Sequence, residues 1–599
     1  MRISELKFNG GMEVDTSKAD VIVLVGPNNA GKSRTLQEVM TLAQQNASSA
    51  FQRNQLVVLE AYRTEKLLDA DGASAWLSEN RFTSVVEPGT QRRSVRAIGS
   101  GDFQLDRTGQ FWSHEEHFGE LATQLFRLIG PGDGRGMLGQ PGRLGPRQLP
   151  DHVVQTLVRN TETRRAFESA FRSAFGQNLI IDSWLANTVI RLSRTQVQAD
   201  FAYESLDGLP SDELADRLAG LATLDAQSDG IRAFAGLLLT LITVRHPVLM
   251  LDEPETFLHP PQARLLGEYL ARLRGDGQLF IATHSLDILL GLLQQSAARV
   301  LVVRLSRRDD RTSALVVNPD AVRSLWRDPL LRFSRALDGL FHEGVVVCEG
   351  DTDSQFYSAV SYHLARHQSQ PATASSTSTP GTPRDDDNAA ASPLPEFSAN
   401  PFDVMFSYAG GKQRIKMISS ALSAVRVPVR CIVDFDVLNN ETTLRGLVES
   451  LGHSYPAELE QKRRLVDAGI RGQQAALTVG RVRAAVEEAL AAADDTPIDA
   501  AIRSAIDAAL ESPAGWSAAK KKGRAEVPAG DATVALESLF EELRHRGIHV
   551  VPSGAVESWV KTASHNGSAW VVDVIERDLI GAATEAQAFV RDVVQSLAV

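Results

Sequence analysis

Short apolar runs alternate with stretches of helical periodicity in the first part of the chain. The run VIVLV (21–25) precedes a glycine-rich turn and a helical pattern, and VLML (248–251) and LFIA (279–282) are each followed by a helical pattern as well. Apolar runs of this length, flanked in this way, are typical of buried strands. Their alternation with helices predicts an α/β domain, which we place at residues 1–112 and 221–340.

A second series of strand-like runs begins near residue 341. Its members are GVVVCEG, DVMFSY (403–408), PVRCIVDFD (428–436) and GIHVVP (547–552). Helical patterns separate these runs, so the sequence predicts a second α/β domain over 341–599.

Four segments depart from these two series. Residues 113–220 are mostly helical in pattern, apart from a Gly/Pro/Arg-rich stretch at 130–147 that we expect to be a mobile loop. Residues 368–400 are rich in Ser, Thr, Pro and Ala and poor in large apolar residues, which predicts a disordered insertion. Residues 441–545 are rich in Ala, Glu and Arg with helical periodicity, which predicts a helical insertion in the second domain.

The composition limits the possible function classes. The chain has 599 residues, of which 43% are hydrophobic, so about two to four globular domains are expected. Its 74 acidic and 62 basic residues give a net charge of −12, which argues against coating nucleic acid or anionic membrane through overall charge. Cys348 and Cys431 lie in apolar runs, which favours buried free thiols in the cytoplasm. We expect no signal peptide and no membrane span, because the longest apolar stretch, 233–244, is too short.

A glycine-rich segment follows the first predicted strand. GPNNAGKS, from Gly26 to Ser33, fits the pattern G-x-x-x-x-G-K-[ST] between a strand and a helix. In such a loop, backbone N–H groups face phosphate oxygens, Lys32 reaches the β- and γ-phosphates, and Ser33 ligates Mg²⁺. The alternative is a glycine turn that carries a lysine by chance. The motif predicts ATP binding with Mg²⁺ through Gly26, Asn28, Asn29, Gly31, Lys32 and Ser33.

Two later motifs fit the same nucleotide site. The strand VLML delivers Asp252 to the magnesium ion, and the adjacent Glu253 can polarise the attacking water. In IATHS, His284 follows the next strand, where an imidazole can contact the γ-phosphate. A lone histidine is more often structural, but the order of the motifs favours the catalytic interpretation.

Carboxylates follow the predicted strands of the second domain. Glu349 and Asp353 stand in EGDTD, Asp434 and Asp436 in CIVDFDV, and Glu557 lies beyond the strand at 547–552. Several carboxylates at neighbouring strand ends repel one another unless cations lie between them, and oxygen donors favour Mg²⁺ or Mn²⁺. The alternative is that each motif is a solvated turn or a helix cap.

The order of the nucleotide motifs, with ETFLHP before ATHS, resembles ABC ATPases of the SMC-like and OLD (overcoming lysogenization defect) kind. That resemblance implies a signature segment before Asp252, and Ser228 and Gly230 match its S-x-G, although Ile231 and Arg232 then depart from the usual polar residues. In such ATPases the signature helix faces the γ-phosphate of the other protomer. The resemblance therefore implies a homodimer, with residues 113–220 as a dimerisation insert, and the short spacing between the motifs favours the OLD type over true SMC proteins.

The acidic motifs resemble the Toprim domain of topoisomerases, primases and OLD-family nucleases. They follow the order E-G-x-x-D, a GGK turn at Gly410–Lys412, D-x-D, and G-x-x-E. The resemblance implies two metal ions held by Glu349, Asp353, Asp434, Asp436 and Glu557. It also implies that Lys561 or Lys412 faces the charge of the transition state.

Both halves together resemble the OLD family, which includes the nuclease subunit of the Gabija antiphage system and nucleases paired with retrons. The resemblance implies an α/β protein that is an ATP-regulated, metal-dependent DNA endonuclease in bacterial antiphage defence, acting on phage or plasmid DNA. It implies a homodimer or higher homo-oligomer, with a defence-system protein or a retron as a candidate partner. Two alternatives stay open: an ATP-driven DNA-binding or repair protein with an inactive Toprim site, and a Toprim ribonuclease. The basic segment 515–525, which includes Trp516, could bind nucleic acid or be a solvated loop.

Overall fold

The chain folds into two compact units, Met1–Arg323 and Ser324–Val599, in a computed structural model of the protein. The structure describes all residues except 46–55, 86–92, 99, 146–147, 149, 184–185, 195–215, 217, 244, 274, 295–298, 329–335, 369–402, 473–478, 491–501, 504–505, 507–514, 563–566 and 598–599. None of the helices within these described ranges has the length and apolar character needed to cross a membrane.

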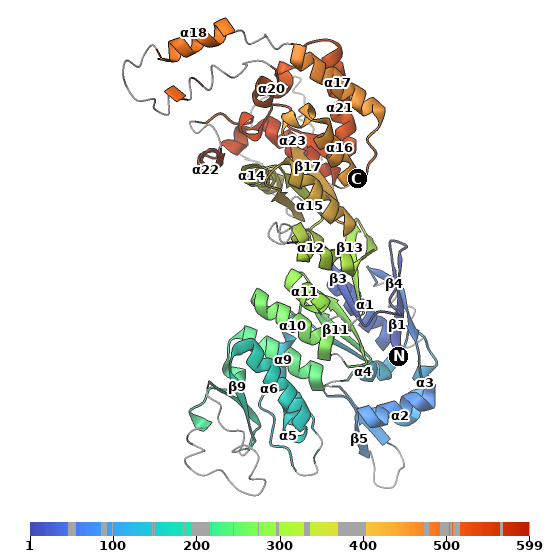
Figure 1. Cartoon of the computed structure of the whole chain (residues 1–599). Helices are drawn as coiled ribbons and strands as arrows, with labels where there is room; N and C mark the ends of the chain where they lie inside the picture. Colours follow the sequence, from blue (N-terminus) through green and yellow to red (C-terminus); the bar gives the residue numbers. More distant parts are fainter. Residues whose placement is uncertain are drawn as a thin grey trace, which may run out of the picture. The chain divides into compact units, whose positions relative to one another are not determined.

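A six-stranded sheet forms the centre of the first unit (Figure 1). Its order is β14-β13-β3-β12-β11-β8, and every neighbouring pair is parallel except β13 and β14. The strands are β3 (Val21–Val25), β8 (Phe126–Ile129), β11 (Val248–Asp252), β12 (Gln278–Ala282), β13 (Val300–Arg308) and β14 (Arg311–Val317). All residues of β3, β11 and β12 are buried because helices or a second sheet cover both faces, which explains their continuous apolar runs.

Two layers enclose this sheet. On one face, α1 (Lys32–Gln44) packs through Leu36 and Val39 into a core shared with the antiparallel sheet β2-β1-β4. Helices α9 (Asp229–Thr243), α10 (Pro260–Leu273) and α11 (Leu286–Gln294) lie on the other side of the sheet (Figure 1). The strands of the small sheet are β1 (Arg2–Phe8), β2 (Glu13–Asp15) and β4 (Leu59–Glu65). This packing fixes the start of α1, and with it the glycine-rich loop, against the sheet.

Smaller elements complete the first unit. A second antiparallel sheet, β5-β6-β7, and a hairpin of β9 and β10 lie outside the central sheet. The remaining elements are α2 (Ala70–Asn80), β5 (Phe82–Val85), β6 (Arg93–Arg96), β7 (Phe103–Gln104), α3 (Thr108–Trp112), α4 (Ala122–Leu125), η4 (Asp133–Leu138), α5 (Val153–Arg159), α6 (Thr161–Phe175), β9 (Asn178–Asp182) and β10 (Val189–Ser193).

The structure corrects the expectation of a helical insert at 113–220. Strand β8 belongs to the central sheet because it pairs with β11, and β9 and β10 form a hairpin, so the described part of this segment is mixed in structure. The Gly/Pro/Arg stretch is also not a free loop over its whole length. A Cβ on Gly236 of α9 would lie 1.8 Å from the Gly134 backbone oxygen, so η4 and α9 pack backbone to backbone. Glycine at both positions allows this close approach.

The second unit contains a four-stranded sheet of order β16-β15-β17-β18, in which all neighbouring strands are parallel. Its strands are β15 (Gly344–Cys348), β16 (Val404–Tyr408), β17 (Val429–Val433) and β18 (Ile548–Val550). One face packs on α14 (Asp351–Gln368), α22 (Gly567–Glu576) and α23 (Thr584–Ser596) through a core that includes Val346, Phe356 and Trp570. Cys348 and Cys431 are buried and free, as expected from their apolar surroundings.

Most of the remaining helices belong to the predicted helical insertion at 441–545. They are α16 (Glu441–Ser450), α17 (Ala457–Gly472), α18 (Val479–Leu490), α20 (Trp516–Lys522) and α21 (Asp531–His545), while α12 (Pro319–Arg327) and α15 (Lys412–Ala424) precede the insertion. The described parts of 441–545 are therefore helical. The predicted disordered segment 368–400 lies outside the described residues, except for the last residue of α14.

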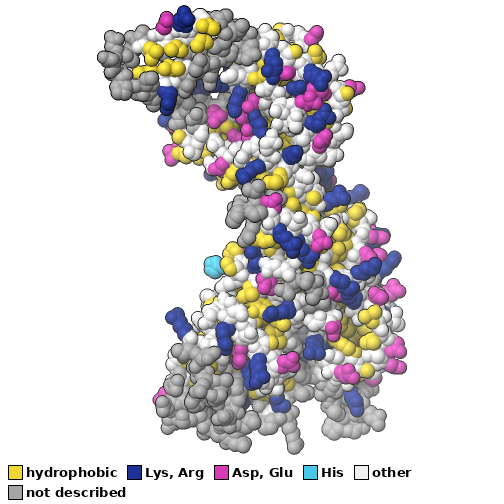
Figure 2. Space-filling view, in the orientation of Figure 1, with side chains coloured by type: hydrophobic (Ala, Val, Ile, Leu, Met, Phe, Trp, Pro, Cys, Tyr) yellow, Lys and Arg dark blue, Asp and Glu magenta, His cyan; other side chains and the backbone are white. Residues whose placement is uncertain are grey.

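The boundary between the units differs from the predicted one at 340/341. Residues 336–341 form a 3₁₀ helix whose Gly339 packs against Val345 of β15 and Leu422 of α15, so this segment belongs to the second unit. On the face of the molecule shown in Figure 2, Lys and Arg side chains are interspersed with Asp and Glu.

Candidate functional site

The glycine-rich loop leaves β3 through a backbone path that needs glycine. Gly26 and Gly31 have φ of 139° and 95°, and Asn29 has φ of 61°, all in the left-handed range. A Cβ on Gly26 would lie 2.2 Å from the Leu305 backbone oxygen, so no larger residue fits there. The loop then enters α1 at Lys32, with Asn28 and Asn29 exposed at its tip. Backbone amides ahead of a helix N-terminus form a phosphate-binding arrangement.

Lys32 lies across this loop. Its Nζ donates hydrogen bonds to the backbone oxygens of Gly26, at 2.9 Å, and Pro27, at 2.7 Å, and the residue is 5% exposed. The ammonium group is therefore held at the loop by carbonyl oxygens, close to the backbone amides that the motif predicts will face phosphate.

The strand order brings the second motif to the loop. Asp252 ends β11, and the Oγ of Ser33 donates a hydrogen bond of 2.7 Å to its Oδ1. Burial raises the pKa of Asp252, the neighbouring Glu253 raises it further, and the bond from Ser33 acts in the opposite direction. A hydroxyl and a carboxylate at this distance suit a shared Mg²⁺, which prefers oxygen ligands.

Glu253 and His284 face each other beside Asp252. The His284 Nε2 lies 3.6 Å from Glu253 Oε1, and Glu253 has a left-handed backbone with φ of 46°. Burial lowers the pKa of His284 to about 4, and the charge of Lys32 adds to that effect. The imidazole is therefore neutral at pH 7. Strand β12 lies between β3 and β11, which explains why His284, just after β12, reaches both motifs.

Glu255 is a buried residue of this site that the sequence reasoning did not single out. Its Oε1 accepts hydrogen bonds from Thr283 Oγ1 at 2.6 Å and from the His284 backbone N–H at 2.8 Å. Its Oε2 is buried without a hydrogen-bond partner, and burial raises its pKa. Glu255 thus joins the segment after β11 to the segment after β12. The sequence did offer one signal for Glu255, which is the last acid of DEPE (252–255). An acid this close to a buried strand needs hydrogen-bond partners if it is buried as well.

The candidate signature residues lie at the start of α9. Ser228 is exposed and precedes the helix, and a Cβ on Gly230 would lie 2.5 Å from the Phe257 backbone oxygen. Asp229 between them pairs with Arg135 at 3.1 Å and with Arg232 at 3.6 Å. The predicted S-x-G motif therefore lies at a helix N-terminus. Arg232, one of the two residues that depart from the expected pattern, pairs with Asp229, the middle residue of the motif.

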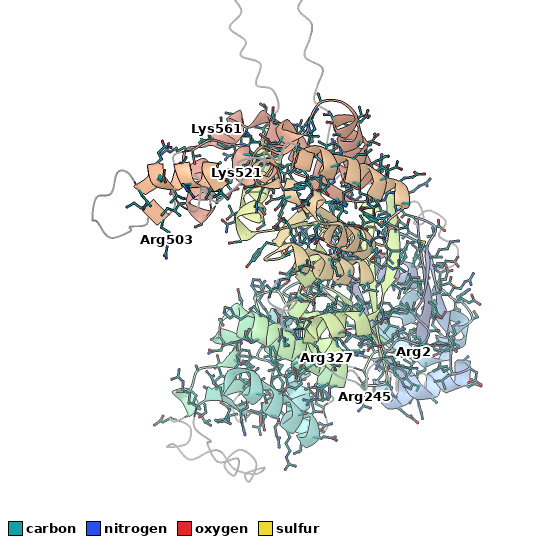
Figure 3. The ribbon with its side chains drawn as sticks, turned by 45° about the horizontal axis from the view of Figure 1, so that its top comes forward. Arg2, Arg245, Arg327, Arg503, Lys521 and Lys561 are labelled. Atoms are coloured by element: carbon teal, nitrogen blue, oxygen red, sulfur yellow. The ribbon has the colours of Figure 1, made fainter. Side chains whose placement is uncertain are left out.

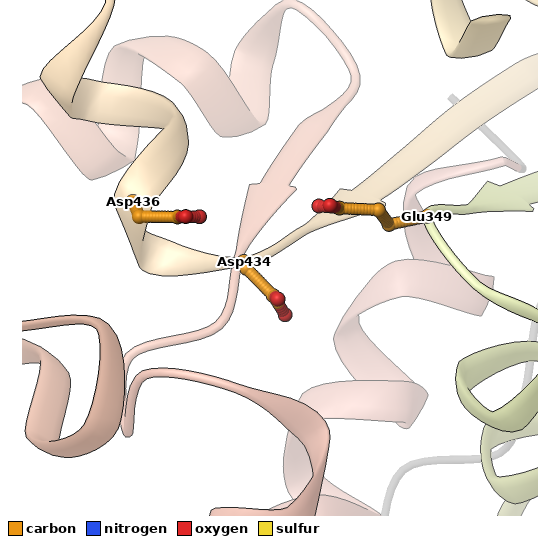
Figure 4. A group of neighbouring side chains, drawn as sticks. All are labelled: Glu349, Asp434 and Asp436. Carbon is orange, nitrogen blue, oxygen red and sulfur yellow. The ribbon is translucent and has the colours of Figure 1, made fainter. Parts of the chain in front are cut away.

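Three of the predicted metal ligands converge in the second unit (Figure 4). Glu349 follows β15, Asp434 follows β17, and Asp436 lies in the 3₁₀ helix Phe435–Asn439. Carboxylate oxygens of these three residues lie within 4.8 Å of one another. Because β15 and β17 are parallel neighbours, their carboxyl ends meet at the same edge of the sheet.

Asp353 and Glu557 stand beside this cluster and not within it. The Oδ2 of Asp353 accepts a hydrogen bond of 2.8 Å from the Gly350 backbone N–H, so it caps the start of α14. Burial raises the pKa of Asp353 to about 6, and the nearby Glu557 contributes to that rise. Glu557 accepts a 3.5 Å bond from the Gly567 backbone N–H. The structure therefore brings together three of the five predicted ligands and places two next to them.

The electrostatics of the cluster indicate an excess of negative charge. Burial raises the pKa of Asp434 to about 8, with further contributions from Glu349, Asp353 and Asp436. Burial also raises the pKa of Glu349, and its Oε2 is buried without a hydrogen-bond partner. A buried carboxylate oxygen without a partner is costly, and a bound cation would satisfy it. Oxygen donors of this type fit Mg²⁺ or Mn²⁺.

Two lysines contact the carboxylates. Lys412 forms a short ion pair with Asp436 and lies 3.9 Å from Glu349, so the structure favours Lys412 over Lys561. Lys561, labelled in Figure 3, is exposed, and none of the ion pairs in the described part of the chain joins it to these acids. The second cation is Lys520 of α20, whose Nζ lies 3.5 Å from Asp436 Oδ2. The sequence placed Lys520 only within the basic segment 515–525.

Trp516 of the same helix does not offer a surface for base stacking, so that option is wrong. It is buried, its Nε1 donates to Asp467 Oδ1 at 2.7 Å, and its ring packs against Phe435. The apolar ring anchors α20 on the segment that carries Asp436 and thereby positions Lys520.

Comparisons with known proteins bear on the first unit. Residues 103–290 match the family described as "AAA domain, putative AbiEii toxin, Type IV TA system". This match covers less than half of the chain; it includes Asp252 and His284 but not the glycine-rich loop. No curated protein matches the sequence.

Among solved structures, the chain is similar to the SMC head domain from Thermotoga maritima, with 14% identity, a TM-score of 0.29, and coverage of 53% of this chain and 100% of that one. It is also similar to an SMC head bound to the C-winged helix domain of ScpA, with 12% identity, a TM-score of 0.31, and coverage of 53% and 98%. The glycine-rich loop, the bond from Ser33 to Asp252 and the match to an AAA domain family together indicate an ATPase domain in the first unit.

Proposed function

We propose that the protein is an ATP-regulated, metal-dependent DNA endonuclease, in which the first unit binds ATP and the second unit cuts the strand. The observation that carries the proposal is the convergence of Glu349, Asp434 and Asp436 from two neighbouring strand ends. Without that convergence, the structure would support an ATPase function and no second activity. The order of the acidic motifs along the chain supports a Toprim domain of the OLD kind for the second unit.

In the ATPase unit, the loop amides and Lys32 bind the phosphates. Ser33 and Asp252 would hold Mg²⁺, since their oxygens already share a hydrogen bond. Glu253 is the candidate to orient and polarise the attacking water, and neutral His284 beside it can accept or donate a hydrogen bond at the γ-phosphate. Glu255 holds the backbone of His284 in place from the other side.

In the nuclease unit, Glu349, Asp434 and Asp436 would hold Mg²⁺ or Mn²⁺, and Asp353 with Glu557 would extend the site on the side of α14. A divalent cation bound there supplies an activated water at neutral pH and stabilises charge on the phosphate that is cut. Lys412 and Lys520 neutralise part of the cluster. With a strand bound at the cluster, these two ammonium groups are the candidates to contact its phosphate oxygens.

The oligomer and the biological setting belong to the same proposal. Ser228 and Gly230 at the start of α9 support a homodimer in which this helix end meets the γ-phosphate held by the partner protomer. The similarity of the motif order to OLD nucleases supports a role in antiphage defence.

The test is nicking of a supercoiled plasmid by the purified protein with Mg²⁺ or Mn²⁺, with and without ATP. The variant Asp434→Asn keeps the shape of the side chain and removes its charge. The control is Asp531→Asn in the same unit, an exposed acid at the start of α21 that does not belong to the cluster. We expect metal-dependent nicking that is lost in Asp434→Asn and kept in Asp531→Asn. Equal nicking in wild type and Asp434→Asn would contradict the assignment of the site.

Two rival functions give different results in the same assay. A labelled RNA in the reaction would be cut in preference to DNA if the second unit is a ribonuclease, because two-metal chemistry does not depend on the 2′-hydroxyl. ATP-dependent DNA binding without any cutting would favour a DNA-binding or repair protein with an inactive second unit.

A further inference from the structure

Two carboxylates beside the metal cluster, those of Asp353 and Glu557, come from segments that are far apart in the chain. Asp353 lies in the first turn of α14, and Glu557 lies in the 3₁₀ turn Val556–Ser558 after β18. Burial raises the pKa of Asp353 and the charge of Glu557 raises it further, so the two acids lie within electrostatic range of each other. Ionised carboxylates at close range repel each other. Contacts between the two segments must therefore hold the acids together.

A hydrogen bond between side chains joins the same two segments. The Nε1 of Trp559 donates to the hydroxyl oxygen of Tyr357 at 3.1 Å. Tyr357 follows Asp353 by four residues, so both lie on the same face of α14, one turn apart. Trp559 follows Glu557 by two residues. Each end of the bond is therefore next to one of the two acids.

The tyrosine end of this bond is fully buried. Tyr357 is 0% exposed. Burial raises the pKa of its hydroxyl well above the usual value, the bond from Trp559 acts in the opposite direction, and the charge of Asp353 adds to the rise. The hydroxyl is therefore neutral and can accept the indole N–H close to the acids. An indole N–H can only donate, and losing a buried partner costs free energy, so the bond favours a fixed position of the turn.

Aromatic packing holds the bond in place. The rings of Trp559 and Tyr357 both pack against Phe589 of α23, with centroid distances of 5.4 Å and 6.0 Å. The next residue of the turn, Val560, accepts a hydrogen bond of 2.9 Å at its backbone oxygen from Trp570 Nε1, and Trp570 belongs to the same core. Tryptophan N–H groups thus fix two consecutive residues of the turn that carries the last acid.

We propose that Tyr357 and Trp559 are positioning residues of the metal site. Their hydrogen bond holds Glu557 beside Asp353 against the repulsion of the two carboxylates, so that the two acids stay together before a cation binds. The inference rests on the proposed function, because it concerns the metal site of the nuclease unit. Residues that position metal ligands typically contribute about 10–100-fold to metal affinity.

The experiment measures Mn²⁺ binding by isothermal titration, without nucleotide or DNA. All variants are made in a full chain that carries Asp252→Asn, which removes the candidate metal carboxylate of the ATPase unit. Tyr357→Phe keeps the ring and removes the hydroxyl, and Trp559→Phe keeps an aromatic ring and removes the N–H. Each change should weaken Mn²⁺ binding about tenfold. The double variant should bind no more weakly than either single variant, because both changes break one hydrogen bond.

A further variant tests whether the bond acts through Glu557. Glu557→Gln removes the charge that the bond is proposed to position. Adding Tyr357→Phe to Glu557→Gln should not change the remaining Mn²⁺ affinity, whereas a general loss of structure would lower it again.

The matched control is Tyr455→Phe in the same unit. It removes a hydroxyl that donates to Glu460 Oε2 at 2.8 Å, and Glu460 is not one of the cluster acids. This variant should leave the Mn²⁺ affinity unchanged. Melting temperatures are recorded for every variant. If Tyr357→Phe does not fold, Trp559→Phe still decides the question, because Trp559 is only half-buried.

The outcomes separate this inference from the proposed function. A wild-type protein that binds Mn²⁺ but does not nick DNA would refute the nuclease and leave the binding test intact. Three results would overturn the inference: no Mn²⁺ binding by the chain with Asp252→Asn alone, equal losses in Tyr357→Phe and Tyr455→Phe, or losses that add in the double variant.

Discussion

Replacing Lys520 by alanine separates a catalytic contribution of this lysine from a structural one. Its Nζ lies 3.5 Å from Asp436 Oδ2, and its side chain is 53% exposed. Two unit charges at that distance attract by about 5 kcal/mol at an effective dielectric constant of about 20. Solvent screening of a half-exposed ammonium group reduces the net contribution to about 1 kcal/mol or less. The variant should therefore fold and melt nearly as the wild type does.

The same change has two opposite effects on the proposed nuclease. Loss of one cation near the scissile phosphate should slow cleavage about fivefold, which corresponds to about 1 kcal/mol, and should reduce the salt dependence of DNA binding by about one charge. Lys520 competes with Mg²⁺ for Asp436, so its removal should lower the Mg²⁺ concentration that gives the half-maximal cleavage rate. A purely structural role of Lys520 would not produce this combination.

The assay is plasmid nicking as a function of Mg²⁺ and of salt concentration. Lys521→Ala is the control, since Lys521 is the next residue of α20, is exposed, and has no ion pair in the described part of the chain. Lys520→Ala and Lys521→Ala with the same maximal rate and the same Mg²⁺ requirement would refute the reasoning. If the wild-type protein does not nick the plasmid at all, the proposed function is refuted instead.

Three further predictions address the first unit. Glu253→Gln should retain ATP binding but hydrolyse ATP about 100-fold more slowly, measured by phosphate release, since a general base typically contributes that much or more. Gly236→Ala would place its Cβ 1.8 Å from the Gly134 oxygen and should lower the free energy of unfolding by about 2 kcal/mol, whereas Gly136→Ala, with open space around it, should not. Burial lowers the pKa of His246 in the folded protein to about 3, so only the unfolded chain takes up a proton at this residue as the pH falls below 6.5. The free energy of unfolding should therefore decrease by about 2 kcal/mol between pH 7 and pH 5, measured by denaturant unfolding, and His246→Phe should remove this decrease.

The backbone geometry of the glycine-rich loop could be predicted closely from the sequence because its residues are contiguous. Gly26, Gly31, Lys32 and Ser33 belong to one loop whose backbone positions each residue, so their spacing carries the geometry. Glu255 escaped prediction because its role depends on Thr283 and His284, which adjoin it only when β12 packs beside β11.

The acidic site was predicted only in part. Glu349 and Asp434 follow neighbouring parallel strands, so the alternation of strands and helices was enough to suggest that they meet. Lys520 could not be predicted as their partner, since nothing in the lysine run distinguishes it from Lys521. Its position depends on Trp516, which packs against Phe435 and fixes which face of α20 turns to Asp436.

The sequence by itself determined the two α/β series, the loop that binds phosphate, and the acids at the strand ends, because these features depend on local backbone preferences and on the period of apolar residues. The tertiary structure determined which residues from distant parts of the sequence contact one another. It placed β8 in the central sheet, packed the Gly134 segment on α9, selected Lys412 and Lys520 over Lys561, and left His246 buried beside a cavity. These outcomes depend on contacts between residues far apart in the chain. Packing and charge at close range determine the free energy of such contacts, and no local sequence pattern encodes them.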